Sequence, residues 1–497
     1  MSDGHRVGRL SALSFLALVL ERVISLALIA VVAALFGVTA DTDTYFLALI
    51  VPAALGYALV EALYTVFVPF FAARAEAPRP ALSAALRVAV VPTAVLTGAY
   101  VAAVLIASPR GLAVWLAFSG ALFAAPPSGV FAGFLIVKHR YAVAALRIPF
   151  ISAVALLVAV VLLSLWQTIT ALAIAVSVGQ LASLGLLIAV SARLAPGAEG
   201  QRRERASIRV LRPAPAVFVA TLVGPQMVIV LERALASTLA AGAVTLLVNA
   251  RGFVLVPAMA AQALAIGVFP AASERYRTLG HEALAGLALT AVRLSALIAL
   301  VSAAYVAICR RELVEVVLER GKFGSEDARE TARLIAIMAP SLIGVSGAAV
   351  AGRTLFGVGR QRVVAIVSAG AVALYVAFAV GLREVWGVEG LAAAFVASSI
   401  AGGAALGIVL ARALELPLRS VVREWLVVPA ALALVFAAAA AGAWLAVRRE
   451  DGGVLASSVT LVVVALAGLG ALAIALVAAR AREWELLRGG LLARWTG

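Results

Sequence analysis

Cysteine, histidine and aromatic residues are scarce in this sequence of 497 residues. Its one cysteine, Cys309, excludes an intrachain disulfide and a cysteine-based metal cluster. The three histidines, His5, His139 and His281, are far apart in polar connections, which excludes a local histidine motif for a metal. Aromatic residues make up only 7% of the sequence. A cluster of aromatic and basic residues is typical of nucleic-acid binding, and the sequence has no such cluster. We therefore expect no metal, no cofactor and no nucleic-acid partner.

Charged residues are also few, at 13%, whereas hydrophobic residues reach 64% and the mean hydropathy is +1.10. A soluble domain is roughly half apolar and a quarter charged, so the composition favours a membrane protein. A spanning helix needs about 20 apolar residues. Fourteen such stretches, rich in Ala and Leu and without the alternation of barrel strands, predict an all-α polytopic bundle of 14 transmembrane helices. They lie at 10–36, 44–71, 84–107, 112–137, 143–165, 168–191, 213–238, 244–273, 287–308, 331–357, 363–383, 389–411, 421–446 and 454–479.

The formal net charge of +15 is distributed unevenly between the two sides of the predicted bundle. With the N-terminus in the cytoplasm, the connections on that side hold 26 Lys and Arg against 10 Asp and Glu, and the opposite connections hold 10 against 12. This distribution satisfies the positive-inside rule and predicts that both termini are cytoplasmic. The cytoplasmic connections would be 1–9, 72–87, 138–147, 192–212, 274–293, 358–362, 412–424 and the C-terminal tail.

A basic segment near the middle of the chain divides the first twelve predicted spans into two sets of six. Each set begins with a Leu-Glu-Arg triplet, then a Val-Pro-Ala triplet, then a Val-Phe pair followed closely by Pro. A parallel repeat of this kind is typical of transporters that work by alternating access. We therefore expect an N-lobe at 1–191, a basic cytoplasmic linker at 192–212, a C-lobe at 213–413, and two further spans with a cytoplasmic tail at 414–497.

Residues 310–330 connect the ninth and tenth predicted spans on the outer face. Their charges nearly balance and their apolar residues have helical spacing, which predicts a short interfacial helix. Ser325, followed by Glu326 and Asp327, then resembles a helix N-terminus, where acidic side chains are favoured by the helix dipole.

Seven charged residues fall within the predicted spans, where an ionised side chain costs about 2.5–3.5 kcal/mol on insertion scales. They are Glu21, Arg22, Glu61, Glu232, Arg233, Arg251 and Arg353. Such residues face a hydrated cavity, pair with one another, or both. Arginine suits an anionic substrate because its planar fork binds phosphate bidentately and stays charged when buried.

Two interpretations remain open for most of these charges. Arg22 and Arg251 either bind an anionic substrate or lock the lobes together through ion pairs. Glu21, Glu61 and Glu232 either pair structurally or couple transport to a proton or cation. Arg353 is near the end of its span and can reach the interface.

Neighbouring residues on a helix point about 100° apart, so we expect that Glu21 and Arg22 do not neutralise each other and each needs another partner. The same argument applies to Glu232 and Arg233. Asp43, at the outer end of the second span, either caps a helix or belongs to the site.

Short motifs recur in order over about residues 10–410: Phe36-Gly37, Asp43-Thr44-Tyr45-Phe46-Leu47-Ala48, Pro52, Glu61, Phe67-Val68-Pro69, Asn249-Ala250-Arg251, Glu319-Arg320-Gly321-Lys322-Phe323 and Arg353-Thr354-Leu355-Phe356-Gly357. Together they resemble the MviN/MurJ-type lipid II flippases of the multidrug/oligosaccharidyl-lipid/polysaccharide (MOP) exporter superfamily. The resemblance implies a plan of six, six and two helices. It also implies a transporter rather than an enzyme, which flips undecaprenyl-diphosphate-linked lipid II across the bacterial inner membrane.

From this resemblance we predict four substrate-binding residues, Arg22, Arg251, Glu61 and Asp43. For Glu21, Glu232, Arg233 and Arg353 we predict ion coupling or charge pairing. The partners would be the undecaprenyl-diphosphate-linked glycan, the bilayer and cell-wall synthesis enzymes.

The sequence departs from the family at two pairs of positions. Leu28 and Ile29 stand where the family has Arg-Asp, and Gly56 and Tyr57 stand where it has Arg-Arg. Another polyprenyl-linked glycan is therefore an alternative substrate. A cation-coupled exporter of small molecules and a scaffold that recruits cell-wall enzymes through 192–212 are alternatives of other classes.

Overall fold

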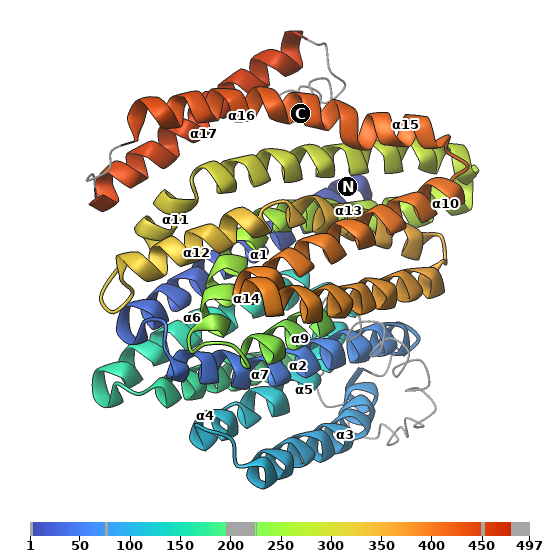
Figure 1. The fold of residues 1–497 in the computed structure, drawn as a ribbon. Helices are drawn as coiled ribbons and strands as arrows, with labels where there is room; N and C mark the ends of the chain where they lie inside the picture. The colour runs from blue at the N-terminus through green and yellow to red at the C-terminus, as the bar shows by residue number, and fades with distance from the viewer. Residues whose placement is uncertain (1–2, 75–77, 195–223, 225, 449–452, 479–497) are drawn as a thin grey trace. The chain divides into compact units, whose positions relative to one another are not determined.

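The computed structural model describes residues 3–74, 78–194, 224, 226–448 and 453–478; at 3–15, 65, 263–284, 287, 357, 418, 420 and 424 it describes the backbone only. The regular elements of these residues are all helical, and no strand occurs among them (Figure 1). The chain divides into two compact units, residues 1–245 and 246–497. The predicted linker at 192–212 and the C-terminal tail lie almost wholly outside the described residues.

The first unit contains eight described helices and the beginning of a ninth. They are α1 (Asp3–Phe36), α2 (Ala40–Ala72), α3 (Pro78–Ala107), α4 (Leu112–Ala117), α5 (Ser119–Val137), α6 (Tyr141–Trp166), α7 (Ile169–Leu194), α9 (Met227–Ala236) and the start of α10 (Ala243–Ile308). Local sequence explains several ends. Gly37 adopts a positive φ of 66° after α1, and Thr39 caps α2 by exchanging hydrogen bonds with Thr42.

The core of the first unit forms where α2 packs against α5. A cluster of buried aromatic side chains, including Phe67, Phe71 and Phe134, fills this contact near the C-terminal end of α2. The two backbones approach closely at Gly129, where an added Cβ would lie 2.8 Å from the carbonyl oxygen of Val60. Only glycine permits this approach, which also brings Glu61 of α2 close to α5.

The second unit contains the remainder of α10 and the helices that follow it. They are α11 (Arg310–Val317), α12 (Ser325–Met338), α13 (Ser341–Gly357), α14 (Gln361–Ala413), α15 (Leu418–Val422), a π-helical turn η3 (Arg423–Val427), α16 (Val428–Val447) and α17 (Gly453–Ala478). The predicted short helix at 310–330 is present as α11, and Ser325 is the first residue of α12 as predicted.

Three predicted segments have features that the sequence pattern does not give. Residues 274–293, predicted as a cytoplasmic connection, are helical and lie within α10, which also carries the apolar stretches Ala243–Gln262 and Ala288–Ile308. The fourth predicted span, 112–137, is an apolar span of the structure but is interrupted at Phe118 between α4 and α5, and the tenth is bent by 49° between α12 and α13. The predicted separation of the eleventh and twelfth spans is visible at Gly387, whose φ of 55° and ψ of −127° interrupt α14.

Eleven helices of the described residues are long and apolar enough to cross a membrane, or twelve if the bent pair α12–α13 counts as one span. The chain is thus an all-α, multi-pass membrane protein. Fourteen spans are consistent with these helices, because α14 contains its break at Gly387 and part of the seventh predicted span lies outside the described residues.

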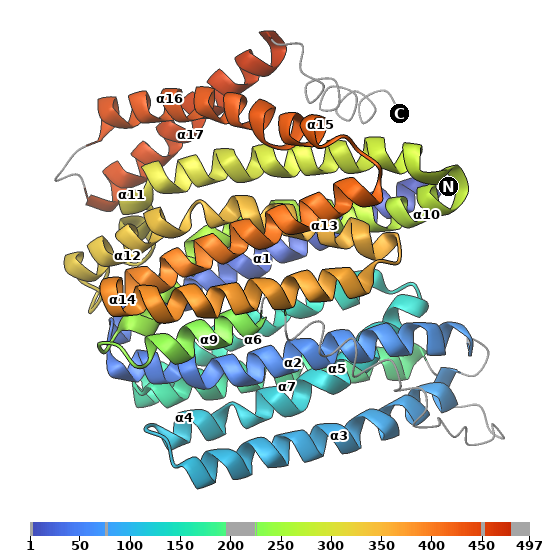
Figure 2. The ribbon, with the colours of Figure 1, turned by 45° about the vertical axis from the view of Figure 1, so that its right-hand side comes forward.

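The last two spans pack against the second half of α10 and against α11. In both ribbon views α16 and α17 lie side by side (Figures 1 and 2). A buried cluster that includes Leu297, Phe436 and Val464 joins α10, α16 and α17. The indole Nε1 of Trp444 donates a hydrogen bond of 2.6 Å to Glu312, which fastens α16 to α11.

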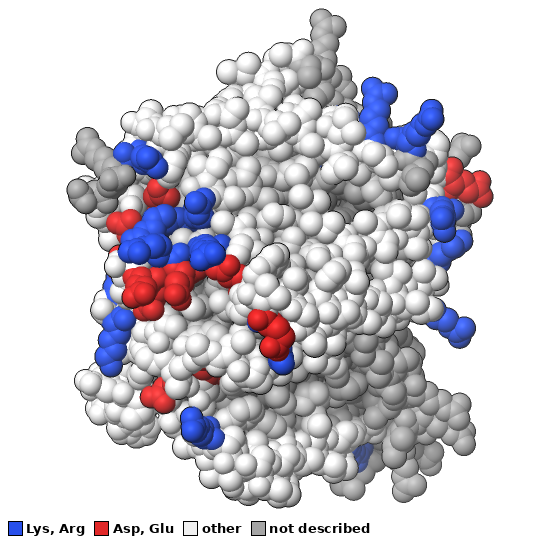
Figure 3. All heavy atoms as spheres, viewed as in Figure 1, with Lys and Arg blue, Asp and Glu red and all other residues white. Residues whose placement is uncertain are grey.

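Charged side chains gather at the end of the second unit where α11 and α12 meet, as Figure 3 shows at the left of its view. Ion pairs there join Arg311 to Glu319 at 3.3 Å and Arg333 to Glu389 at 2.7 Å. Apolar helix surfaces adjoin this group of charges, as expected of a membrane protein whose charges collect at helix ends.

Candidate functional site

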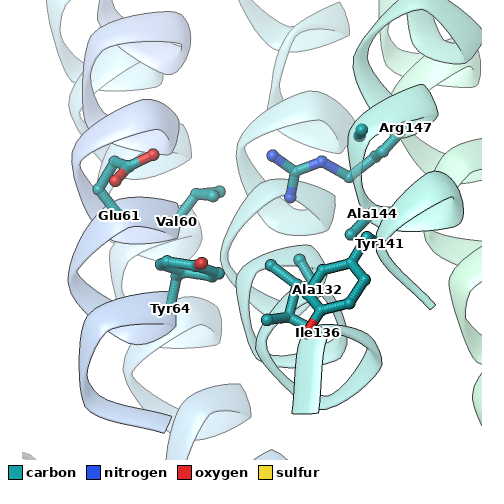
Figure 4. Close-up of a pocket in the computed structure, with 9 residues that line it drawn as sticks. Val60, Glu61, Tyr64, Ala132, Ile136, Tyr141, Ala144 and Arg147 are labelled. Atoms are coloured by element: carbon teal, nitrogen blue, oxygen red, sulfur yellow. The ribbon is translucent and has the colours of Figure 1, made fainter. Parts of the chain in front are cut away.

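A cavity of about 210 Å³ lies between α2, α5 and α6 in the first unit (Figure 4). Three helices contribute its walls: Val60, Glu61 and Tyr64 from α2, Ala132 and Ile136 from α5, and Tyr141, Ala144, Ala145 and Arg147 from α6. Figure 4 shows the carboxylate of Glu61 and the guanidinium of Arg147 facing each other from opposite walls. Both polar groups therefore project into the cavity, and one of them was predicted as a site residue.

Arg147 is a functional candidate that sequence reasoning missed. We assigned it to the cytoplasmic connection 138–147, but it lies inside α6, about two turns from the start of that helix at Tyr141. Its Nε and Nη1 atoms are buried and have no hydrogen-bond partner among the described residues. The apolar run around Arg147 already extends back to Tyr141, so a span that began there would have included this arginine.

Glu21 and Arg22 contact each other, contrary to the expectation that neighbours on a helix would not pair. The Nε atom of Arg22 lies 3.7 Å from a carboxylate oxygen of Glu21, because both side chains are long enough to bend across the helix surface. Ser25 donates a second interaction, a hydrogen bond of 2.6 Å to Glu21. The Arg22 Nε is buried without a hydrogen-bond partner in the described part of the chain.

Arg233 connects α9 to α2. Its Nη1 donates a hydrogen bond of 2.7 Å to the backbone carbonyl of Phe46, and its guanidinium lies 6.0 Å from the centre of the Phe46 ring. Glu232, the preceding residue, is 2% exposed. Arg233 thus joins α9 to α2 within the first unit, and Glu232 beside it is buried.

The carboxylate of Asp43 is hydrogen bonded at the N-terminus of α10. One oxygen accepts from the Gly242 N–H at 2.6 Å, and the other accepts from the N–H and the hydroxyl of Thr245 at 2.8 and 2.6 Å. Of the two interpretations of Asp43, helix capping is therefore observed, although the capped helix is α10 and not α2, which carries Asp43. Binding of substrate by Asp43 stays a prediction.

Arg251 lies in the second unit, on α10. It is 6% exposed, and its guanidinium stacks on the ring of Phe395 in α14 at 3.9 Å. Asn249, one of the motif residues, is also buried, and its Nδ2 has no hydrogen-bond partner among the described residues. Arg353 on α13 is exposed.

Within the first unit the structure brings one pair of predicted residues together, Glu21 with Arg22. Asp43 and Arg233 have other partners, the N-terminus of α10 and Phe46 respectively. The structure places Glu61 with the unpredicted Arg147. In the described part of the chain, no three His, Cys, Asp or Glu side chains are arranged to hold a metal ion.

Comparison with known proteins adds an independent observation. The family model for the lipid II flippase MurJ matches residues 127–464. Among solved structures, the chain resembles a lipid II flippase MurJ in an inward closed conformation. The TM-score is 0.76 at 15% identity, covering 94% of this chain and 99% of that one. Among curated proteins, none matches the chain.

Two other solved structures share the fold at lower similarity. One is an outward-facing multidrug resistance transporter of the MATE family and MOP superfamily, with a TM-score of 0.62, 13% identity and coverage of 82% and 95%. The other is a MOP superfamily transporter from Pyrococcus furiosus, with a TM-score of 0.62, 14% identity and coverage of 84% and 96%. These neighbours agree with the predicted superfamily.

Proposed function

The chain belongs to the lipid II flippase MurJ family, and from this premise we propose that it translocates lipid II, an undecaprenyl-diphosphate-linked cell-wall precursor, by alternating access. The observation that carries the proposal is the family match over residues 127–464. The fold supports it, since the similarity to the inward closed MurJ structure covers 94% of this chain. This is the work of a transporter, and we assign no catalytic residue.

Two arginines are the residues we propose to bind the anionic headgroup. Arg251 is supported by its burial on α10, where a guanidinium stacked on Phe395 remains charged and can still present N–H groups at its edge. Arg22 is supported by its buried Nε, which lacks a hydrogen-bond partner among the described residues. A phosphate oxygen would satisfy such a donor.

We propose the bacterial inner membrane as the location, with both termini in the cytoplasm, on the basis of the family and of the sequence's charge distribution. Cell-wall synthesis enzymes are the proposed protein partners, since a flipped precursor has to be passed on to the enzymes that consume it.

Reconstitution tests the proposed function. Purified protein in vesicles that contain lipid II should expose the headgroup on the opposite leaflet, and exposure should fall at least tenfold in Arg22→Ala and in Arg251→Ala. Arg360→Ala is the matched control, because Arg360 is an exposed arginine at the turn before α14. Normal transport by both the Arg22→Ala and the Arg251→Ala variant, with folding intact, would contradict the headgroup role of these arginines.

A different polyprenyl-linked glycan is the second candidate substrate. It is favoured by Gly56 and Tyr57, which occupy positions where the resemblance implies two arginines. The same vesicles, prepared with lipid II or with another undecaprenyl-diphosphate sugar, separate the two candidates. Dissipating the proton and sodium gradients in both preparations then tests coupling through Glu21, Glu61 or Glu232, as a cation-coupled exporter would require.

A further inference from the structure

The cavity between α2, α5 and α6 contains a charged group that nothing in the proposed function uses. We propose that this cavity is a binding pocket for a glycosyl phosphate, in which Arg147 binds the phosphate oxygens and Glu61 accepts hydrogen bonds from the sugar hydroxyls. The inference rests on the proposed function, because it assigns part of the lipid-linked headgroup to a second place in the first unit.

The donors of Arg147 are the first observation. A guanidinium has five N–H donors in a planar fork, and two of the nitrogens of Arg147, Nε and Nη1, are buried without a hydrogen-bond partner in the described residues. Buried donors are normally satisfied, and the guanidinium of Arg147 projects toward the cavity, so we infer that a ligand bound there supplies the acceptor. A phosphate accepts from two nitrogens of one guanidinium at once.

The opposite wall explains why the ligand would carry more than a phosphate. Glu61 faces Arg147 across the cavity, and the two charges interact (Figure 4). An ionised carboxylate only accepts hydrogen bonds, and it repels a bare anion. A group that presents an anion to Arg147 and hydroxyl donors to Glu61 matches the charges of both walls, and a glycosyl phosphate has this combination.

The remaining lining suits a sugar. Tyr64 and Tyr141 add aromatic rings with polar hydroxyls, and the short side chains of Ala132 and Ala144 leave space between the helices. A cavity of about 210 Å³ also exceeds by far the 10–15 Å³ that a single water requires. The α2 and α5 walls of the pocket are held in close backbone contact at Gly129, which fixes the position of Glu61 against α5.

Thiol protection measures occupancy of this pocket directly. The native Cys309 is buried, so Ala144→Cys would introduce a reactive cysteine into the cavity wall. The control is Ala142→Cys, two residues earlier on α6, where the side chain is exposed. Three probes are added separately before a maleimide: lipid II in vesicles, N-acetylglucosamine 1-phosphate, and inorganic phosphate. We expect a glycosyl phosphate to slow labelling at Ala144→Cys at least fivefold and to leave Ala142→Cys unchanged.

Combination with Arg147→Gln identifies the binding residue. Protection of Ala144→Cys should be lost when Arg147→Gln is added. In Arg147→Lys, which keeps the charge but loses the planar fork, protection should need about a tenfold higher concentration of the probe. Arg140→Gln, at an exposed arginine just before α6, should protect as the parent does. If Arg147→Gln does not fold, the Lys variant and Glu61→Gln carry the test.

Each outcome decides between the possibilities. Protection by lipid II alone supports the pocket with the lipid headgroup as its source, and protection by the soluble sugar phosphate supports it with a free ligand as its source. Protection that persists in the Arg147 variants, equal protection by inorganic phosphate, or no protection by any probe overturns the inference. If the wild-type protein flips lipid II while the pocket fails these tests, the proposed function stands without it. If protection holds and no lipid-linked glycan is flipped, the proposed function fails alone.

Discussion

Asp43 and Thr245 join the first turn of α2 to the first turn of α10. Both the backbone N–H and the hydroxyl of Thr245 donate to the same carboxylate oxygen of Asp43, at 2.8 and 2.6 Å. The residues are separated by 202 positions in the sequence, and each lies at the start of its helix. This contact holds the N-terminus of the helix that carries Arg251, one of the two proposed headgroup residues.

Asp43→Asn should lower the stability of the protein by about 1–3 kcal/mol, because the amide nitrogen cannot accept from Gly242 or Thr245 and the charge at the helix N-terminus is lost. Thermal unfolding of the purified protein in detergent measures the change. Asp41→Asn is the control, since Asp41 lies in the same turn of α2 and is exposed. Equal melting temperatures for the two variants would show that the contact does not stabilise the fold.

Gly242→Ala should destabilise the contact between α2 and the start of α10. The backbone conformation alone should cost about 1–2 kcal/mol or more, because Gly242 has a φ of +94°. An added Cβ would also overlap the Cγ1 of Val38. The double variant with Val38→Ala should recover the part due to overlap and retain the backbone part. Gly98→Ala, in open space on α3, should be neutral or slightly stabilising, and a loss of stability there comparable with Gly242→Ala would contradict this explanation.

Much of the fold could be predicted because apolar runs record which segments cross a membrane. Both the short helix α11 and the start of α12 at Ser325 followed from local pattern alone. The local pattern does not show whether a connection is helical. The charged stretch 274–293 is predicted as a connection, and α10 continues through it, because a helix tolerates such residues wherever it leaves the apolar layer.

The site was less predictable because its residues meet through packing. Glu61 stood out as a charge in an apolar run, whereas Arg147 was hidden by its position near a span end, where arginines usually mark topology. The pairing of Glu21 with Arg22 depends on side-chain flexibility that ideal helix geometry leaves out. The partner of Asp43, 202 residues away, follows only from the three-dimensional contact of α2 with α10.

Phe395→Leu should weaken the second unit by up to about 2 kcal/mol, because it removes the ring on which the desolvated guanidinium of Arg251 stacks at 3.9 Å. If the ring only holds the arginine in place, transport should fall less in Phe395→Leu than in Arg251→Ala. Thermal unfolding and headgroup exposure in vesicles measure the two effects. A Phe395→Tyr variant keeps the aromatic face and should retain both properties, whereas a loss in that variant equal to Phe395→Leu would exclude stacking as the cause.

Trp444→Phe should loosen α16 from α11. The indole donates a hydrogen bond of 2.6 Å to Glu312, a carboxylate that is 8% exposed, and bonds to charged acceptors contribute about 1.5–3 kcal/mol. We expect faster proteolytic cleavage between α16 and α17 and a lower melting temperature. Trp386→Phe is the control, because Trp386 is 56% exposed on α14. Cleavage at the parental rate in Trp444→Phe would mean that apolar packing alone fastens α16.

Cys309 should resist alkylation in the folded protein up to about pH 9. Burial raises the pKa of its thiol from 9.0 to about 12, and the negative charge of nearby Glu312 adds to the increase. Only the thiolate reacts, so roughly one thiol in a thousand is reactive at pH 9 in the native state, against about half of them at the ordinary pKa.

Wild-type protein incubated with a maleimide at pH 7, 8 and 9 should remain unlabelled, and should label fully once unfolded in detergent at the same pH. Glu312→Gln should lower the thiol pKa only slightly, since burial is the larger cause, and rapid labelling of the folded wild type would show that the thiol is accessible.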